Sequence, residues 1–221
     1  MSPFQDRSKA RKNKQKSANF KAKKGHLSKS PSQPGKTSRG LVRIIAGTHR
    51  GRRLPVLVSE GLRPTSDRVK ETLFNWLMTH TTGAKCLDMF AGSGALGIEA
   101  LSRGAAHVTF IEQEKTVAEQ LNNNLVTLRE ADKAEVVMGN AYSHEFDSAA
   151  AYNIVFIDPP FGKEMVEKSI NILLSSKILS PNALIYIETA HSDEYAVPSC
   201  FSLVKQIKTS QVFAALFELN T

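Results

Sequence analysis

The sequence is poor in cysteine and lacks any long apolar run. Only Cys86 and Cys200 occur among the 221 residues, and they form no CxxC pair. So few thiols are typical of a protein from a reducing compartment, and we expect two packing cysteines in a cytoplasmic protein. No apolar stretch approaches the ~18 residues that a membrane span needs. The six histidines show neither an HExxH motif nor paired ligand spacing, so we expect no metal site.

Acidic residues are nearly absent from the N-terminal end. Residues 1–40 hold 12 Lys and Arg against one acidic residue, and they contain almost nothing apolar. Such a composition cannot bury enough surface to offset its ordering entropy, so we predict a disordered basic tail. It is either a polyanion-binding arm or a solvated tail without a specific role. Residues 76–221 hold 10 basic and 17 acidic residues, so the basic character of this +8 chain sits at one end.

Residues 41–80 are predicted to form a β-hairpin and a helix at the start of one domain, 41–221. The stretch "VRIIAGTHRGRRLPV" is typical of two short strands around a turn at 48–51. Ser66 or Asp67 can cap a helix over about 67–78. The hairpin carries four arginines, a density of guanidinium groups that suits RNA phosphates; exposed arginines without a partner are the alternative. They are Arg43, Arg50, Arg52 and Arg53.

Strands and helices alternate through the rest of the chain. Strands are expected near 85–89, 107–111, 134–138, 153–157 and 183–188, and helices near 95–103, 114–129, 164–175 and, more weakly, 142–150. This alternation predicts an α/β fold with a doubly wound, mostly parallel sheet. The last segment is typical of two antiparallel strands around a turn at 209–211, which would bring the sheet to seven strands.

A glycine pattern and two acids follow the first strands of this sheet. Gly92-x-Gly94-x-x-Gly97 matches the spacing of a dinucleotide-binding loop. Asp88 ends the strand before it, and Glu112 ends the next strand, 20 residues after Gly92, where an acid can bind two ribose hydroxyls. A tight strand–helix turn with a capping acid is the structural alternative.

The position of Asp88 argues against NAD as the cofactor. A carboxylate there would repel a pyrophosphate but attract a cation. S-adenosyl-L-methionine carries an ammonium and a sulfonium and no phosphate, so it is the better match. Asn140, after the third strand, can hydrogen-bond an adenine edge or cap a helix. The predicted cofactor-binding residues of these loops are Asp88, Phe90, Ala91, Gly92, Gly94, Glu112, Gln113, Asn140 and Ala141.

The stretch "NIVFIDPPFG" ends a buried strand on Asp158, Pro159, Pro160 and Phe161. The prolines have fixed φ and no N–H, so they form a stiff corner with free carbonyl groups. A carboxylate and a carbonyl can accept two N–H groups of an amine on a planar base, while the ring stacks on that base. We therefore predict these four residues to be catalytic, with positioning and electrostatics as the source of the rate. An ordinary strand-to-loop corner is the alternative.

These motifs carry a resemblance to known enzymes. The Asp-Pro-Pro-Phe corner resembles the signature of methyltransferases that act on adenine N6, cytosine N4 or guanine N2. Together with "RIIAGTHRGRRLPV", "GLRPTSDRVKETLFNWL" and "CLDMFAGSGALGIEALSRGA", it resembles the bacterial 16S rRNA guanine-966 N2-methyltransferase family from about Val42 to Leu219. The resemblance implies a class I Rossmann-like fold and an acceptor in the small ribosomal subunit or its assembly intermediate. It also places Arg63, Thr65 and Arg68 beside the cofactor or the RNA.

Three other functions compete with this interpretation. A DNA adenine-N6 or cytosine-N4 methyltransferase would act on duplex DNA, but the chain has no room for a separate sequence-reading domain. An NAD-dependent oxidoreductase conflicts with Asp88. An RNA-binding assembly factor without catalysis would not need the Asp158 corner. We expect a monomer, because a large RNA substrate needs an open basic face.

Overall fold

The computed structural model describes five stretches of the chain. They are residues 38–58, 66–160, 163–190, 195–210 and 212–220, and all of them belong to one compact unit, Gly35–Thr221. The predicted tail as far as residue 37 lies outside the described residues, and so do the predicted site residues Arg63, Thr65 and Phe161.

Seven strands form one sheet in the order β5-β4-β3-β6-β7-β9-β8. Their bounds are β3 (Lys85–Asp88), β4 (His107–Glu112), β5 (Ala134–Met138), β6 (Tyr152–Ile157), β7 (Leu179–Ala190), β8 (Phe201–Lys208) and β9 (Val212–Leu219). Strands β3 to β7 run parallel, and β9 pairs antiparallel with both β7 and β8. The predicted doubly wound sheet with an antiparallel C-terminal hairpin is confirmed.

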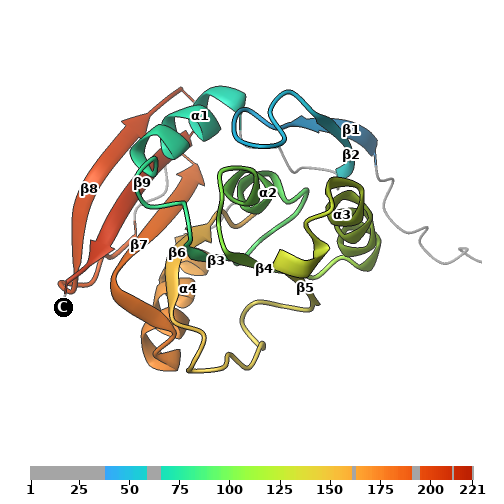
Figure 1. Cartoon of the computed structure of the whole chain (residues 1–221). Helices are drawn as coiled ribbons and strands as arrows, with labels where there is room; N and C mark the ends of the chain where they lie inside the picture. Colours follow the sequence, from blue (N-terminus) through green and yellow to red (C-terminus); the bar gives the residue numbers. More distant parts are fainter. Residues whose placement is uncertain (1–37, 59–65, 161–162, 191–194, 211, 221) are drawn as a thin grey trace, which may run out of the picture. The chain divides into compact units, whose positions relative to one another are not determined.

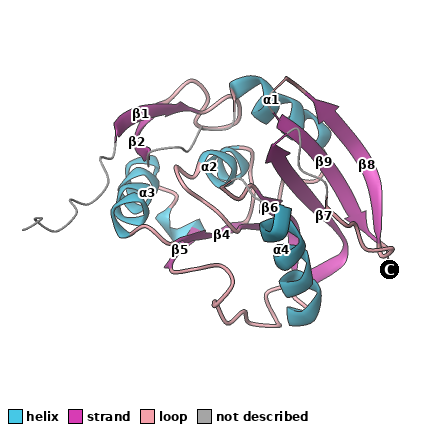
Figure 2. Ribbon diagram, turned by 180° about the vertical axis from the view of Figure 1, so that it is seen from behind, coloured by secondary structure: helices cyan, strands magenta, loops and turns pink. Residues whose placement is uncertain are grey.

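Helices cover both faces of the sheet, as Figures 1 and 2 show. One core joins α1 (Asp67–Trp76), α2 (Ala95–Ser102) and α3 (Lys115–Leu128) to strand residues such as Phe110 and Phe156. A second core joins α4 (Lys163–Ser176) to alternate strand residues such as Ile157. The side chain of Ser66 accepts a hydrogen bond from the Val69 amide and so caps α1, as predicted. In the described ranges no helix is both long and apolar enough to cross a membrane.

The N-terminal hairpin forms a separate two-stranded sheet. Strands β1 (Ser38–Arg43) and β2 (Arg53–Val58) pair antiparallel, which confirms the predicted hairpin. The predicted boundary between tail and hairpin at residue 40 is wrong, because residues 38–40 already pair with β2. Val42 and Val56 turn their side chains to Ala95, the first residue of α2, and the three form a small core of their own. The hairpin thereby packs beside the glycine loop.

The weak helix predicted near 142–150 is wrong. Residues 139–151 are described and contain turns instead. The Asn140 carboxamide oxygen accepts the Tyr142 amide at 2.8 Å, and the Asp147 carboxylate accepts the Ala149 amide at 2.9 Å. Because Asn and Asp side chains bind nearby amides in this way, they compete with helical hydrogen bonding.

Candidate functional site

The predicted site residues converge at the carboxyl edge of four neighbouring strands. The loops that follow β5, β4, β3 and β6 lie side by side because these strands are parallel neighbours. Backbone hydrogen bonds tie each loop to the next strand: Met89 to Phe156, Ala91 to Ile111, and Gly139 to Glu112. Asp88 and Glu112 end their strands there and Asp158 directly follows β6, all three in phase with the residues that face α1 and α2. The edge therefore concentrates negative charge on one face.

Asp88 is the most deeply buried of these acids, with 2% of its surface exposed. Its Oδ2 accepts a hydrogen bond from the Gly97 amide in α2 at 3.1 Å. Burial raises the pKa of Asp88 to about 7, and the nearby Glu112 adds to this, while backbone hydrogen bonds from Gly97 and Phe90 oppose it. The carboxyl group thus fixes the glycine loop from below the surface.

Removing the charge of Asp88 is expected to stabilise the fold. The pKa of Asp88 in the native state exceeds the ordinary value of 3.8, so the native state binds the proton more tightly than the unfolded chain does. The free energy of unfolding therefore falls as pH rises from 4 to 7. Asp88→Asn keeps an oxygen for Gly97 and avoids this loss. The stability gain of the variant over the wild type should grow between pH 4 and 7, to on the order of 2–4 kcal/mol, and then stay level.

Urea unfolding at several pH values measures this difference. Asp132→Asn, in the exposed 3₁₀ helix Ala131–Lys133, is the matched control and should leave the pH dependence unchanged. If the free energy of unfolding of the wild type and of Asp88→Asn changed with pH in the same way, burial would not raise the pKa of Asp88.

Glycine is needed at the three positions of this loop for different physical reasons. A Cβ at Gly97 would collide with the Phe110 ring, and one at Gly94, where φ is +76°, would collide with Leu121. These two glycines therefore serve the packing of helix against sheet. At Gly92, where φ is +50°, a Cβ would meet only the Phe90 carbonyl oxygen, 4.0 Å away. Open space beside the loop exists only at this glycine of the three, which makes it the one suited to a ligand's approach.

Glu112 is half-buried and held in place through both carboxylate oxygens. Oε2 accepts the Gly92 amide and Oε1 accepts the Glu114 amide, each at 2.7 Å. Each oxygen keeps a second lone pair, so the carboxylate is oriented in advance for two hydroxyl groups of a ligand. The segments 88–94 and 112–114 contain no Lys or Arg. This set of groups fits a ribose and a cation and does not fit a phosphate.

The remaining predicted cofactor residues line the same edge. Phe90 is half-buried and meets Tyr142 edge to face, with ring centroids 5.8 Å apart. Gln113 is exposed beside Glu112, while Ala91 and Ala141 are buried. The Asn140 carboxamide oxygen accepts the Tyr142 amide within a turn, and the residue is exposed. Since residues 139–151 contain no helix, the predicted capping alternative for Asn140 is wrong.

The Asp158 corner has a neighbour that the sequence argument missed. Asp158 is half-buried, Pro159 is buried and Pro160 is exposed. On the adjacent strand β7, Glu188 is buried and its Oε2 accepts the Tyr186 hydroxyl at 2.7 Å. Burial, the Glu188 carboxylate and, more weakly, Asp158 raise the pKa of Tyr186 well above its ordinary value. A signal was present in the sequence, because the strand predicted over 183–188 also ended on an acid.

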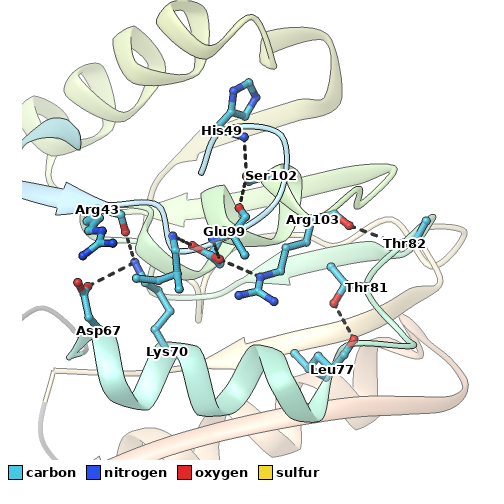
Figure 3. A network of polar contacts seen from close by, with 12 residues as sticks. Arg43, His49, Asp67, Lys70, Leu77, Thr81, Thr82, Glu99, Ser102 and Arg103 are labelled. Atoms are coloured by element: carbon cyan, nitrogen blue, oxygen red, sulfur yellow. Dashed lines mark hydrogen bonds and ion pairs between the residues drawn. The ribbon is translucent and has the colours of Figure 1, made fainter. Parts of the chain in front are cut away.

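The loop between β1 and β2 is anchored to the helices behind the glycine loop (Figure 3). Glu99 of α2 accepts the amides of Ile45 and Ala46 at 2.8 and 3.0 Å and the Arg103 Nε at 2.8 Å. The buried Lys70 of α1 donates to the Arg43 carbonyl at 2.6 Å. Because Glu99 is itself buried, this network fixes the hairpin as a rigid extension of the sheet domain.

The predicted RNA-binding arginines lie on this anchored hairpin. All four are exposed, but Arg52 turns to the end of α3 and donates to the Thr127 carbonyl at 3.4 Å. Arg43, Arg50 and Arg53 have no side-chain partner within the described stretches. Arg68 is exposed in the first turn of α1, and no contact between its side chain and a described residue joins it to the strand ends.

The strand order, the glycine loop and the acidic edge define a class I methyltransferase, as the sequence predicted. The chain belongs to the family described as conserved hypothetical protein 95, whose model matches residues 42–218. The resemblance found in the sequence is confirmed by relatives called ribosomal RNA small subunit methyltransferase D. The relative from Haemophilus influenzae is 50% identical over 82% of this chain and 95% of its own length. The relative from Escherichia coli is 48% identical over 84% of this chain and 94% of its own length.

Solved structures agree with this assignment. A methyltransferase from Escherichia coli shares 46% identity and a TM-score of 0.75, over 82% of this chain and 99% of its own. An RNA methyltransferase from Salinibacter ruber, solved with S-adenosyl-L-homocysteine, has a TM-score of 0.57 over 72% of this chain and 94% of its own. At 14% identity, that second likeness concerns the fold alone.

Proposed function

We propose that this protein methylates the exocyclic N2 amine of a guanine in 16S rRNA of the small ribosomal subunit. The observation that carries the proposal is the Asp158 corner, which stands beside the loops of a cofactor site on the shared edge of the sheet. S-adenosyl-L-methionine is the cofactor, and it supplies a methyl group activated by a sulfonium. The names of the relatives from Haemophilus influenzae and Escherichia coli support rRNA of the small subunit as the substrate.

The acids at the strand ends bind different parts of the cofactor. Glu112, oriented by the Gly92 and Glu114 amides, accepts the ribose hydroxyls. Asp88 supplies negative charge to the cation from beneath the glycine loop. Phe90 and Ala141 form an apolar wall for the adenine, and Asn140 lies at its edge. The absence of basic side chains from these loops suits a ligand without phosphate.

The corner after β6 holds the acceptor amine. Asp158 and a carbonyl of the Pro159–Pro160 turn accept its two N–H groups, and Phe161 stacks on the base. These hydrogen bonds orient the nitrogen and return electron density to it, because the lone pair is otherwise delocalised into the ring. As the methyl group leaves the sulfonium and the new N–C bond forms, the nitrogen becomes acidic and its proton passes to Asp158 or to water; S-adenosyl-L-homocysteine is the other product. The residues therefore act by positioning and charge.

The anchored hairpin supplies the contact with RNA phosphates. The network around Glu99 anchors the loop of the hairpin to α2 and so holds its arginines on the methyltransferase domain. A large substrate needs an open face beside the hairpin, so we expect the protein to act as a monomer.

Replacing hairpin arginines should weaken RNA binding without slowing chemistry. Arg50→Gln and Arg53→Gln should each raise KM roughly three- to tenfold and lower the salt dependence of binding by about one charge, with kcat unchanged. Filter binding between 50 and 200 mM salt, together with initial rates, measures both effects. Lys85→Gln is the matched control, because Lys85 is exposed at the amino end of β3, away from the carboxyl ends that form the site. A fall in kcat with KM unchanged would contradict this role of the hairpin.

The substrate class is tested by methyl transfer to a panel of acceptors. Radiolabelled S-adenosyl-L-methionine is incubated with unmodified small subunits, naked 16S rRNA and duplex DNA. The proposal predicts label on 16S rRNA, either naked or within the subunit, and none on DNA. Label on DNA alone would instead indicate an adenine-N6 or cytosine-N4 methyltransferase.

A further inference from the structure

The carboxyl edge carries a fourth acid, Glu188, whose side chain serves none of the roles above. Strands β6 and β7 are parallel neighbours, and their last paired residues on this side are Ile157 and Ile187. Asp158 and Glu188 therefore follow at equivalent positions, one residue further along each strand. Both are in phase with Phe156 and Tyr186, which pack in the core beneath α1 and α2. The two carboxylates thus share one face of one edge.

The Glu188 side chain is held rigidly on one side and available on the other. Its Oε2 accepts the Tyr186 hydroxyl at 2.7 Å, and the Tyr186 ring is fully buried against Phe156, with centroids 6.4 Å apart. The other oxygen, Oε1, has no hydrogen-bond partner among the described residues. Glu188 as a whole is buried, with 6% of its surface exposed. A fixed acceptor that has one oxygen without a partner in the described stretches therefore lies beside the Asp158 corner.

A second acceptor beside the amine would separate guanine from the other amino bases. Next to its N2 amine, guanine presents N1–H, which is a donor. Next to their amines, adenine and cytosine present a ring nitrogen lone pair, which an anionic oxygen repels. The Asp-Pro-Pro-Phe corner alone binds an amine and does not distinguish these bases.

We propose that Glu188 is a specificity-determining residue, whose Oε1 accepts the N1–H of the target guanine while Asp158 holds the N2 amine. This inference rests on the proposed guanine-N2 activity. Tyr186 acts as a positioning residue, because its hydroxyl occupies Oε2 and turns Oε1 to the base. Glu188 thereby supplies the choice of base that the corner lacks.

A guanine analogue that lacks both O6 and the N1 hydrogen tests this role, because the loss of O6 is common to the wild type and the variant. Small subunits are reconstituted with 16S rRNA that carries either guanine or 2-aminopurine at the methylated position. The analogue keeps the N2 amine and has a lone pair at N1. Glu188→Gln can keep an oxygen on the Tyr186 hydroxyl and offer its NH₂ to N1, which suits the analogue. The ratio of kcat/KM for guanine to that for 2-aminopurine should fall at least about tenfold from wild type to Glu188→Gln.

Control variants distinguish a loss of base discrimination from a general loss of activity. Glu135→Gln, exposed on β5, should keep the wild-type ratio. Tyr186→Phe keeps the carboxylate but releases Oε2, so it should lower the ratio less than Glu188→Gln does. S-adenosyl-L-homocysteine affinity should be unchanged in Glu188→Gln. An unchanged ratio in that variant, with guanine methylated by the wild type, would overturn the role of Glu188 alone. No methylation of guanine by the wild type would overturn the proposed function itself.

Discussion

Asp158→Asn should lower kcat for methyl transfer by about 10²- to 10³-fold, while the Kd for S-adenosyl-L-homocysteine changes less than about threefold. The asparagine is nearly isosteric, but its NH₂ group would meet an N–H of the amine, and it cannot take a proton. Because Asp158 lies after β6 and the glycine loop after β3, the substitution should leave the cofactor loops intact.

Single-turnover rates with saturating cofactor isolate the chemical step in this comparison. Asp132→Asn, in the exposed 3₁₀ helix before β5, is the matched control and should retain full activity. A wild-type rate in Asp158→Asn would remove the acceptor corner from the mechanism.

Glu112→Ala should weaken S-adenosyl-L-homocysteine binding by on the order of 10²-fold. The change deletes the acceptor of the ribose hydroxyls and also frees the Gly92 and Glu114 amides, which Glu112 binds at 2.7 Å each. Two adjoining loops thus lose their shared anchor together with the ligand contact.

Calorimetric titration measures this loss and tests the rival cofactor. Glu119→Gln, exposed on α3, should bind like the wild type, and NAD should not bind to any of these proteins. Undiminished affinity in Glu112→Ala, or tight NAD binding by the wild type, would contradict the assignment of this edge to S-adenosyl-L-methionine.

The sheet could be predicted because local pattern and global fold agree. Each parallel strand is a short apolar run ended by a turn or an acid, and the helices between them have apolar faces that match the two cores. The helix predicted near 142–150 failed because Asn140 and Asp147 bind neighbouring amides with their side chains. A sequence pattern reports the helix propensity of a segment. Whether a side chain binds a nearby amide instead depends on the conformation of the backbone.

The site residues that could be predicted are those marked by a local sequence pattern. Asp88, Glu112 and Asp158 were found because each ends a strand, but the division of labour among the glycines depends on neighbours distant in sequence, such as Phe110 and Leu121. The anchoring of the hairpin by Glu99, 54 residues from Ile45, likewise has no local signature. Glu188 was missed because the strand carrying it lacks a motif after the acid, although the register of β6 and β7 sets it beside Asp158.

The most direct test of the central claim is the chemical identity of the methylated nucleoside. Small subunits that lack the modification are treated with the enzyme and S-adenosyl-L-methionine, and the 16S rRNA is digested to nucleosides for chromatography and mass spectrometry. We expect N2-methylguanosine at a single position, formed by the wild type and lost in Asp158→Asn. N6-methyladenosine or N4-methylcytidine in its place would contradict the assignment of guanine.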